Sequence, residues 1–145
     1  MEILRHAHSG LRWFVLIAII IAIVNALGKS GGTKPFTDKD RKAALFALIF
    51  THVQFVIGLI LYFISPKVVF SGEAMKSDVL RFFLVEHIVL MLIAVILITV
   101  GYSRSKKAVT DRSRFRWILI PYLIALILIL AGIPWPFQDY GTSWF

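Results

Sequence analysis

The sequence predicts an all-α integral membrane protein, with four transmembrane helices in an up-down-up-down bundle. Four long apolar runs support this prediction, because a helix of about 20 residues crosses a hydrocarbon core about 30 Å thick. The runs lack the alternation of polar and apolar residues found in barrel strands, and a bilayer tolerates only helices or closed barrels. The chain has 145 residues, of which 59% are hydrophobic. Little sequence therefore remains for a soluble part.

The predicted spans cover residues 11–28, 43–65, 80–102 and 116–134. The linkers between them are too short for a second domain, so residues 1–145 are expected to form a single four-helix transmembrane domain. The first span follows a charged start, as a signal peptide would, but it lacks a convincing small-x-small cleavage site before a long polar region. We therefore expect it to be a structural helix.

Basic residues are concentrated in two of the three linkers. The linkers before the second and fourth spans hold Lys29, Lys34, Lys39, Arg41, Lys42, Arg104, Lys106, Lys107, Arg112, Arg114 and Arg116. Cytoplasmic loops of membrane proteins are enriched in lysine and arginine. Both termini are therefore expected on the non-cytoplasmic side of a bacterial inner membrane. The net charge of +8 is explained by this topology signal and by contact with membrane lipid, and no nucleic-acid partner is expected.

Several kinds of chemistry are excluded by composition and motifs. The chain contains no cysteine, which rules out disulfides, thiolate metal sites, iron–sulfur clusters and covalent haem attachment through C-x-x-C-H. Phosphate-binding loops, zinc-protease motifs and serine nucleophile elbows are also missing. No catalytic residue is assigned, and any cofactor must be held non-covalently.

Three histidines, His8, His52 and His87, lie on or beside three different apolar runs. Ionisable side chains within a membrane are costly, so they indicate a functional site by default. His8 is the inward candidate of the first segment because Arg12 follows it by one helical turn. His6 points about 200° away from His8 on a helix and is expected at the interface.

The second and third spans carry the deeper histidines. His52 stands near the middle of its run, close to the expected bilayer centre. His87 follows Glu86 a few residues inside the third run. Glu86 can accept a hydrogen bond, carry a proton or pair with Arg81, and the sequence leaves these roles open. It is the candidate for proton coupling.

Haem is the cofactor that this pattern favours. Bis-histidine ligation needs imidazoles from two helices at similar depth, and haem propionates need cations near the membrane surface. Depth favours His52 and His87 as the ligands of the haem iron. His8 is the alternative ligand, because the first and third helices are diagonal in such a bundle. Arg12 and Arg81 are expected to bind the propionates by charge-assisted hydrogen bonds.

Four sequence segments carry a resemblance to a known family. They are HAHSGLRW at residues 6–13, THVQ at 51–54 with GLILY at 58–62, VEH at 85–87, and GIPWPF at 132–137. Across essentially the whole chain, the sequence resembles a family of small four-span bacterial membrane proteins labelled cytochrome B. More distantly, it is similar to one half of haem A synthase. The resemblance implies haem b carried by His52 and His87, with His8 as a further candidate. It does not imply oxygenating activity, because this chain has one bundle and no histidine on the fourth span.

The expected function is one-electron transfer by a membrane cytochrome, with quinol and a redox partner near the outer face. The alternative is a non-catalytic accessory subunit of a larger membrane complex, with structural histidines. The apolar fourth span and the aromatic tail favour this alternative. A metal or proton permease is a third hypothesis, with weaker support because four short helices and one central histidine offer little of a conduction path.

Overall fold

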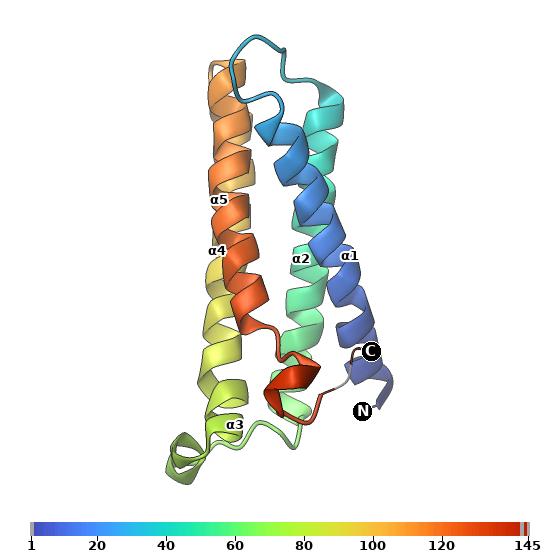
Figure 1. Cartoon of the computed structure of the whole chain (residues 1–145), viewed down its shortest axis with the longest axis vertical. Helices are drawn as coiled ribbons and strands as arrows, with labels where there is room; N and C mark the ends of the chain where they lie inside the picture. The colour runs from blue at the N-terminus through green and yellow to red at the C-terminus, as the bar shows by residue number, and fades with distance from the viewer. Residues whose placement is uncertain (1, 143, 145) are drawn as a thin grey trace.

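The computed structural model describes residues 2–142 and 144, and within these residues it contains helices and no strand. Its four long helical segments run alternately up and down, and the two ends of the chain lie at the same end of the bundle (Figure 1). The long segments are α1 (Glu2–Leu27), α2 (Asp38–Ile64), the continuous stretch Asp78–Lys107, and α5 (Asp111–Gly132). This architecture confirms the predicted all-helical fold with four long apolar helices.

The third long segment is not a uniform α-helix. It begins with α3 (Asp78–Arg81), passes through a π-helical turn, η2 (Phe82–Glu86), and continues as α4 (His87–Lys107). Two short 3₁₀ turns, η1 (Gly72–Lys76) and η3 (Pro136–Gln138), complete the described elements.

The four helices form a ring in which each helix has two neighbours. Helix α1 packs against α2 and α5, and α4 packs against the same two helices. Helices α1 and α4 are therefore diagonal, as the sequence predicts for the first and third spans. This arrangement brings their inward side chains to face each other across the bundle axis.

The long helices extend beyond the predicted apolar spans because polar residues form their first turns. At the start of α2, the Asp40 carboxylate accepts the backbone N–H of Thr37 at 2.8 Å. At the start of α5, the Thr110 hydroxyl accepts the backbone N–H of Ser113 at 3.2 Å. Both contacts satisfy helix N-terminal groups that lack an intrahelical partner.

Small side chains line the axis of the bundle. Each long helix contributes an alanine that is at most 1% exposed: Ala22, Ala47, Ala94 and Ala125. Small residues at such positions let helix backbones approach closely, which is how membrane helices gain packing energy. The bundle is therefore tightly packed through its middle.

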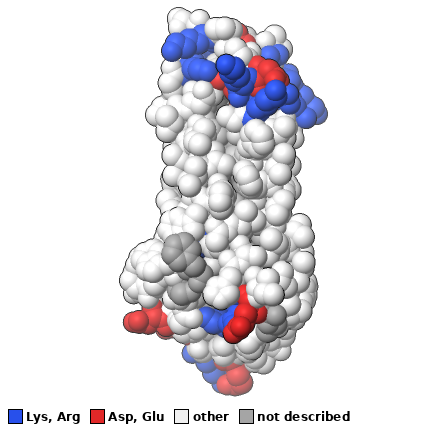
Figure 2. Space-filling view, turned by 90° about the vertical axis from the view of Figure 1, so that its right-hand side faces the viewer, with Lys and Arg blue, Asp and Glu red and all other residues white. Residues whose placement is uncertain are grey.

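The outward faces of all four helices carry large apolar side chains. Ile17, Val56, Ile96 and Ile127 are each more than half exposed. Lysine, arginine, aspartate and glutamate gather at the two ends of the molecule, and the band between them is free of charge on the face drawn in Figure 2. All four helices are long and apolar enough to cross a membrane.

One buried polar contact joins the diagonal pair α2 and α5. The Tyr122 hydroxyl donates to the Ala44 carbonyl at 2.8 Å, and the Tyr122 side chain is fully buried. We expect Tyr122→Phe to lower the free energy of unfolding by about 1 kcal/mol, because an interhelical hydrogen bond contributes about that much. Denaturant unfolding in detergent measures the change, and unaltered stability would contradict this role.

Candidate functional site: a cavity between α1, α2 and α4

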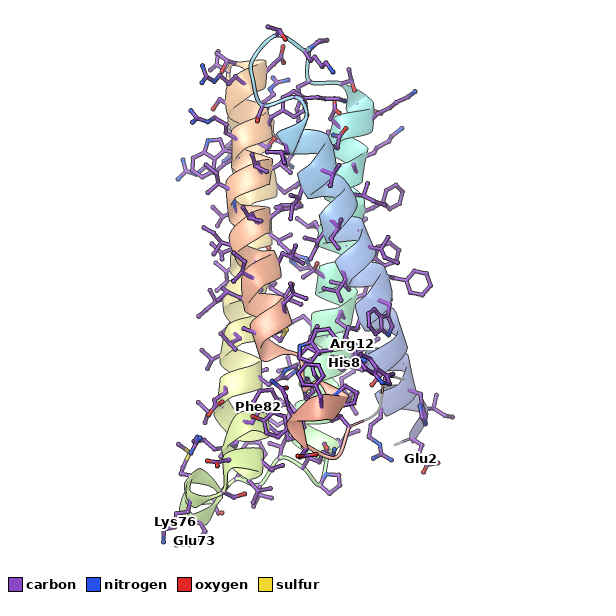
Figure 3. All side chains as sticks on the ribbon, in the orientation of Figure 1. Glu2, His8, Arg12, Glu73, Lys76 and Phe82 are labelled. Carbon is purple, nitrogen blue, oxygen red and sulfur yellow. The ribbon has the colours of Figure 1, made fainter. Side chains whose placement is uncertain are left out.

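A cavity of about 190 Å³ lies at the end of the bundle where the chain begins and ends. Helices α1, α2 and α4 form most of its walls, and the end of α5 with the segment after it closes one side. Figure 3 shows His8, Arg12 and Phe82 at this end of the molecule. The polar side chains and glycine on its walls are Arg5, His8, Ser9, Arg12, Thr51, Gln54, Gly58, Tyr62, Ser65, Lys67 and His87.

The contact of the His87 ring with α5 determines which tautomer its neutral form adopts. Its Nδ1 lies 2.6 Å from the carbonyl oxygen of Gly132. A carbonyl can only accept, so Nδ1 carries the proton and donates it. The neutral ring then has a free lone pair on Nε2. Metal-binding histidines are oriented in the same way, by a backbone carbonyl that fixes the tautomer.

His8 faces His87 from the diagonal helix. The two ring centroids are 6.3 Å apart, and the ring planes are inclined at 76°. His8 Nδ1 is buried and has no hydrogen-bond partner among the described residues. Buried polar atoms are nearly always paired in native proteins, so an unpaired one marks a place where a further group fits.

Gly58 on α2 allows the His8 ring to occupy this position. A Cβ atom built on Gly58 would lie 2.8 Å from His8 Cε1, which is closer than van der Waals contact permits. Any other residue at position 58 would push the imidazole away. Gln54, one turn earlier on α2, donates from Nε2 to the His8 backbone carbonyl at 2.8 Å. Helix α2 thus supports the His8 segment with one glycine and one glutamine.

His52 does not line the cavity. Its Nδ1 donates to the Leu48 carbonyl at 2.7 Å, and its Nε2 lies 3.2 Å from the Thr99 hydroxyl of α4. Since His52 precedes Gly58 by six residues on α2, it lies about 9 Å further along the helix axis. The structure therefore separates His52 from the pair formed by His8 and His87. The Thr99 hydroxyl donates its own proton to the Val95 carbonyl at 2.7 Å, so the firm partner of the His52 ring is the Leu48 carbonyl.

Arg12 and Lys67 place positive charge on the cavity wall. Arg12 is 8% exposed, donates from Nη2 to the Trp144 carbonyl at 2.7 Å, and leaves its Nε without a partner among the described residues. Lys67 donates to the carbonyls of Tyr140 and Gly141, at 3.2 and 2.6 Å. Burial and the nearby charge of Arg5 lower the pKa of Lys67. Lys67 was not among the site residues predicted from the sequence.

Arg81 lies outside the cavity and is held by acids. Its Nε donates to Glu86 at 2.8 Å, and its Nη2 lies 3.0 Å from Asp78. Pairing with Arg81, one of the three roles left open for Glu86, is thus present. The π turn explains this contact, because residues five apart point about 140° from each other on an α-helix. In η2 the His87 N–H bonds to the Phe82 carbonyl, five residues earlier, so residues at this spacing share a face.

The segment after α5 packs against aromatic side chains of α1 and η2 at the same end of the bundle as the cavity. Tyr140 stacks on Phe82 with ring centroids 4.5 Å apart. Trp144 stacks on Trp13 at 6.3 Å, and Trp135 packs against the same two tryptophans. These aromatic contacts hold the carbonyls that accept from Arg12 and Lys67 in place. The segment after α5 thus contacts two residues of the cavity wall through its backbone carbonyls.

The chain matches no protein-family model, no curated protein and no solved structure. The resemblance described above therefore remains a hypothesis, and the function has to be argued from the geometry of the site.

Proposed function

We propose that this protein is a membrane b-type cytochrome that binds haem b between His8 and His87. The observation that carries the proposal is the facing pair of imidazoles, with ring centroids 6.3 Å apart at the wall of a cavity. When bound, haem would supply a centre that accepts and releases single electrons. We infer an exchange of electrons with quinol and a redox partner near the outer face of a bacterial inner membrane.

The spacing of the rings supports coordination of one metal by both histidines. Metal–nitrogen bonds to histidine are about 2 Å long, and the ring centroid lies roughly 1 Å beyond the nitrogen. Two axial imidazoles on one metal therefore have centroids about 6 Å apart. The observed 6.3 Å agrees with this value. His8 and His87 would hold the metal between them, each through one ring nitrogen.

The number of ligands favours haem over a bare metal ion. Among residues 2–142 and 144, no group of three or more histidine, cysteine, aspartate or glutamate side chains is placed to hold a metal ion. Closed metal sites usually have four protein ligands. Two histidines suffice where a macrocycle provides the remaining ligands, as in bis-histidine haem proteins.

In this proposal His52 has a structural role and joins α2 to α4. The pair predicted by depth, His52 with His87, stays a hypothesis that the same experiment tests. His87 belongs to both pairs, so the choice lies between His8 and His52. The facing rings of His8 and His87, the unpaired Nδ1 of His8 and the position of His52 away from the cavity lining support His8.

Absorption spectra of detergent-purified protein test the proposal. Oxidised and dithionite-reduced spectra of the wild type are expected to show low-spin haem, with about one haem per chain by pyridine haemochrome assay. His8→Ala and His87→Ala should each lose the low-spin bands, because each removes an axial ligand. His52→Ala serves as the matched control and should retain them. Loss in His52→Ala with retention in His8→Ala would reverse the assignment.

The accessory-subunit hypothesis is favoured by one observation. Phe137 in the aromatic tail is 72% exposed, and exposed apolar surface beyond the lipid-facing helices fits a contact with another protein. A colourless preparation that stays empty after haem supplementation, and that copurifies with stoichiometric partners, would support this function in place of the cytochrome.

A further inference from the structure

Arg12 and Lys67 carry charge that no acid in the described structure balances. Arg12 is buried at 8% exposure. Neither side chain forms an ion pair within residues 2–142 and 144, where the ion pairs involve other basic residues. A buried charge without a counter-charge is costly. An anion in the cavity would remove this cost.

The partners of these two cations are neutral backbone carbonyls. Arg12 donates to Trp144, and Lys67 donates to Tyr140 and Gly141. All three carbonyls belong to the segment that follows α5, so this one segment holds both cations. A hydrogen bond between two ionised groups is shorter and stronger than one to a neutral carbonyl. A carboxylate that enters the cavity would therefore compete well for both donors.

We propose that Arg12 and Lys67, which both line the cavity, form a subsite for the two carboxylate groups of the tetrapyrrole. This inference rests on the proposed function and names Lys67 as a specificity-determining residue. It also replaces Arg81 in the role expected from the sequence, since Arg81 is already paired with Asp78 and Glu86 outside the cavity.

Esterified porphyrins test the subsite directly. Apoprotein in detergent is titrated with haem, haem dimethyl ester, metal-free protoporphyrin IX and its dimethyl ester. The wild type is expected to bind each free acid about tenfold more tightly than its ester, since the esters cannot form charge-assisted bonds. Lys67→Gln should reduce this preference about fivefold, as expected for a partly exposed ion pair. A purely structural role would weaken acid and ester equally.

Lys76→Gln is the matched control. Lys76 lies at the same end of the molecule and pairs with Glu73 on the surface, so its replacement should leave the acid-to-ester ratio unchanged. Arg12→Gln should also reduce the acid-to-ester ratio. If Arg12→Gln prevents folding because Arg12 is buried, Lys67→Gln still tests the subsite.

Metal-free protoporphyrin IX and its dimethyl ester distinguish the subsite proposal from the cytochrome proposal. If haem and haem dimethyl ester bind with equal affinity and both give histidine-ligated spectra, the subsite is overturned and the cytochrome proposal stands. Absence of histidine ligation, together with a preference for free protoporphyrin over its ester that Lys67→Gln reduces, would overturn the cytochrome proposal and support the subsite. A protein that binds none of the four compounds would overturn both.

Discussion

Asp40→Ala is expected to lower the free energy of unfolding by about 3 kcal/mol, because it leaves a buried polar cluster without its acceptor. Asp40 is 3% exposed. Its carboxylate pairs with the Lys29 ammonium and accepts from Asn25 Nδ2, the Thr37 backbone N–H and the Thr37 hydroxyl, the last three at 2.8 Å. These contacts tie the end of α1, the following linker and the start of α2 together.

Asp38→Ala provides the control for this prediction. Asp38 begins the same helix and pairs with Arg41 and Lys42, but it is exposed to solvent. Its replacement is expected to change stability little, because exposed ion pairs contribute little. Denaturant unfolding of both variants in one detergent gives the comparison. Equal stabilities of the two variants would show that the buried cluster does not hold this end of the bundle.

Gly58→Ala is expected to weaken haem binding by about tenfold to hundredfold, since overpacking by one methyl group costs about 1–3 kcal/mol. The new Cβ would lie 2.8 Å from His8 Cε1. The imidazole would have to move away from α2, and the spacing between His8 and His87 would change. Titration of the apoprotein with haem, followed at the Soret band, measures the loss.

Gly10→Ala is the matched control for this substitution. A Cβ on Gly10 meets no atom within 4 Å, and both glycines lie inside long helices. The gain in helix propensity is therefore similar for the two variants. Gly10→Ala should bind haem as the wild type does. Equal affinities of the two alanine variants would remove His8 from the proposed ligand pair.

The fold follows from the sequence because membrane spans depend on length and polarity alone. The diagonal relation of the first and third helices also follows, since short linkers make successive helices antiparallel neighbours. The helix ends are harder to place, because capping residues such as Thr37 and Thr110 continue the helix into polar sequence. The apolar runs therefore give shorter helices than those observed.

The site is harder to predict from the sequence, because the depth of a residue along its helix does not determine the direction in which its side chain points. His52 sits deepest in its helix and drew attention for that reason, yet helix packing turns it toward Thr99 on α4. In the sequence Gly58 stood out only as part of the segment GLILY at residues 58–62, and its close approach to His8 needs coordinates. Lys67 lies in a linker, where the sequence has no helical periodicity that would predict whether its side chain faces the cavity.

The π turn has a consequence for how the chain tolerates changes in length. It holds one residue more than an α-helix needs for the same turn, since its bonds join residues five apart instead of four. Removing one residue from Phe82–Glu86 would restore an uninterrupted α-helix and leave the register of α4 against its neighbours intact. The same deletion within α4 would rotate all preceding residues by about 100° relative to the bundle. The N-terminal end of this helical segment can therefore diverge in length without disturbing His87.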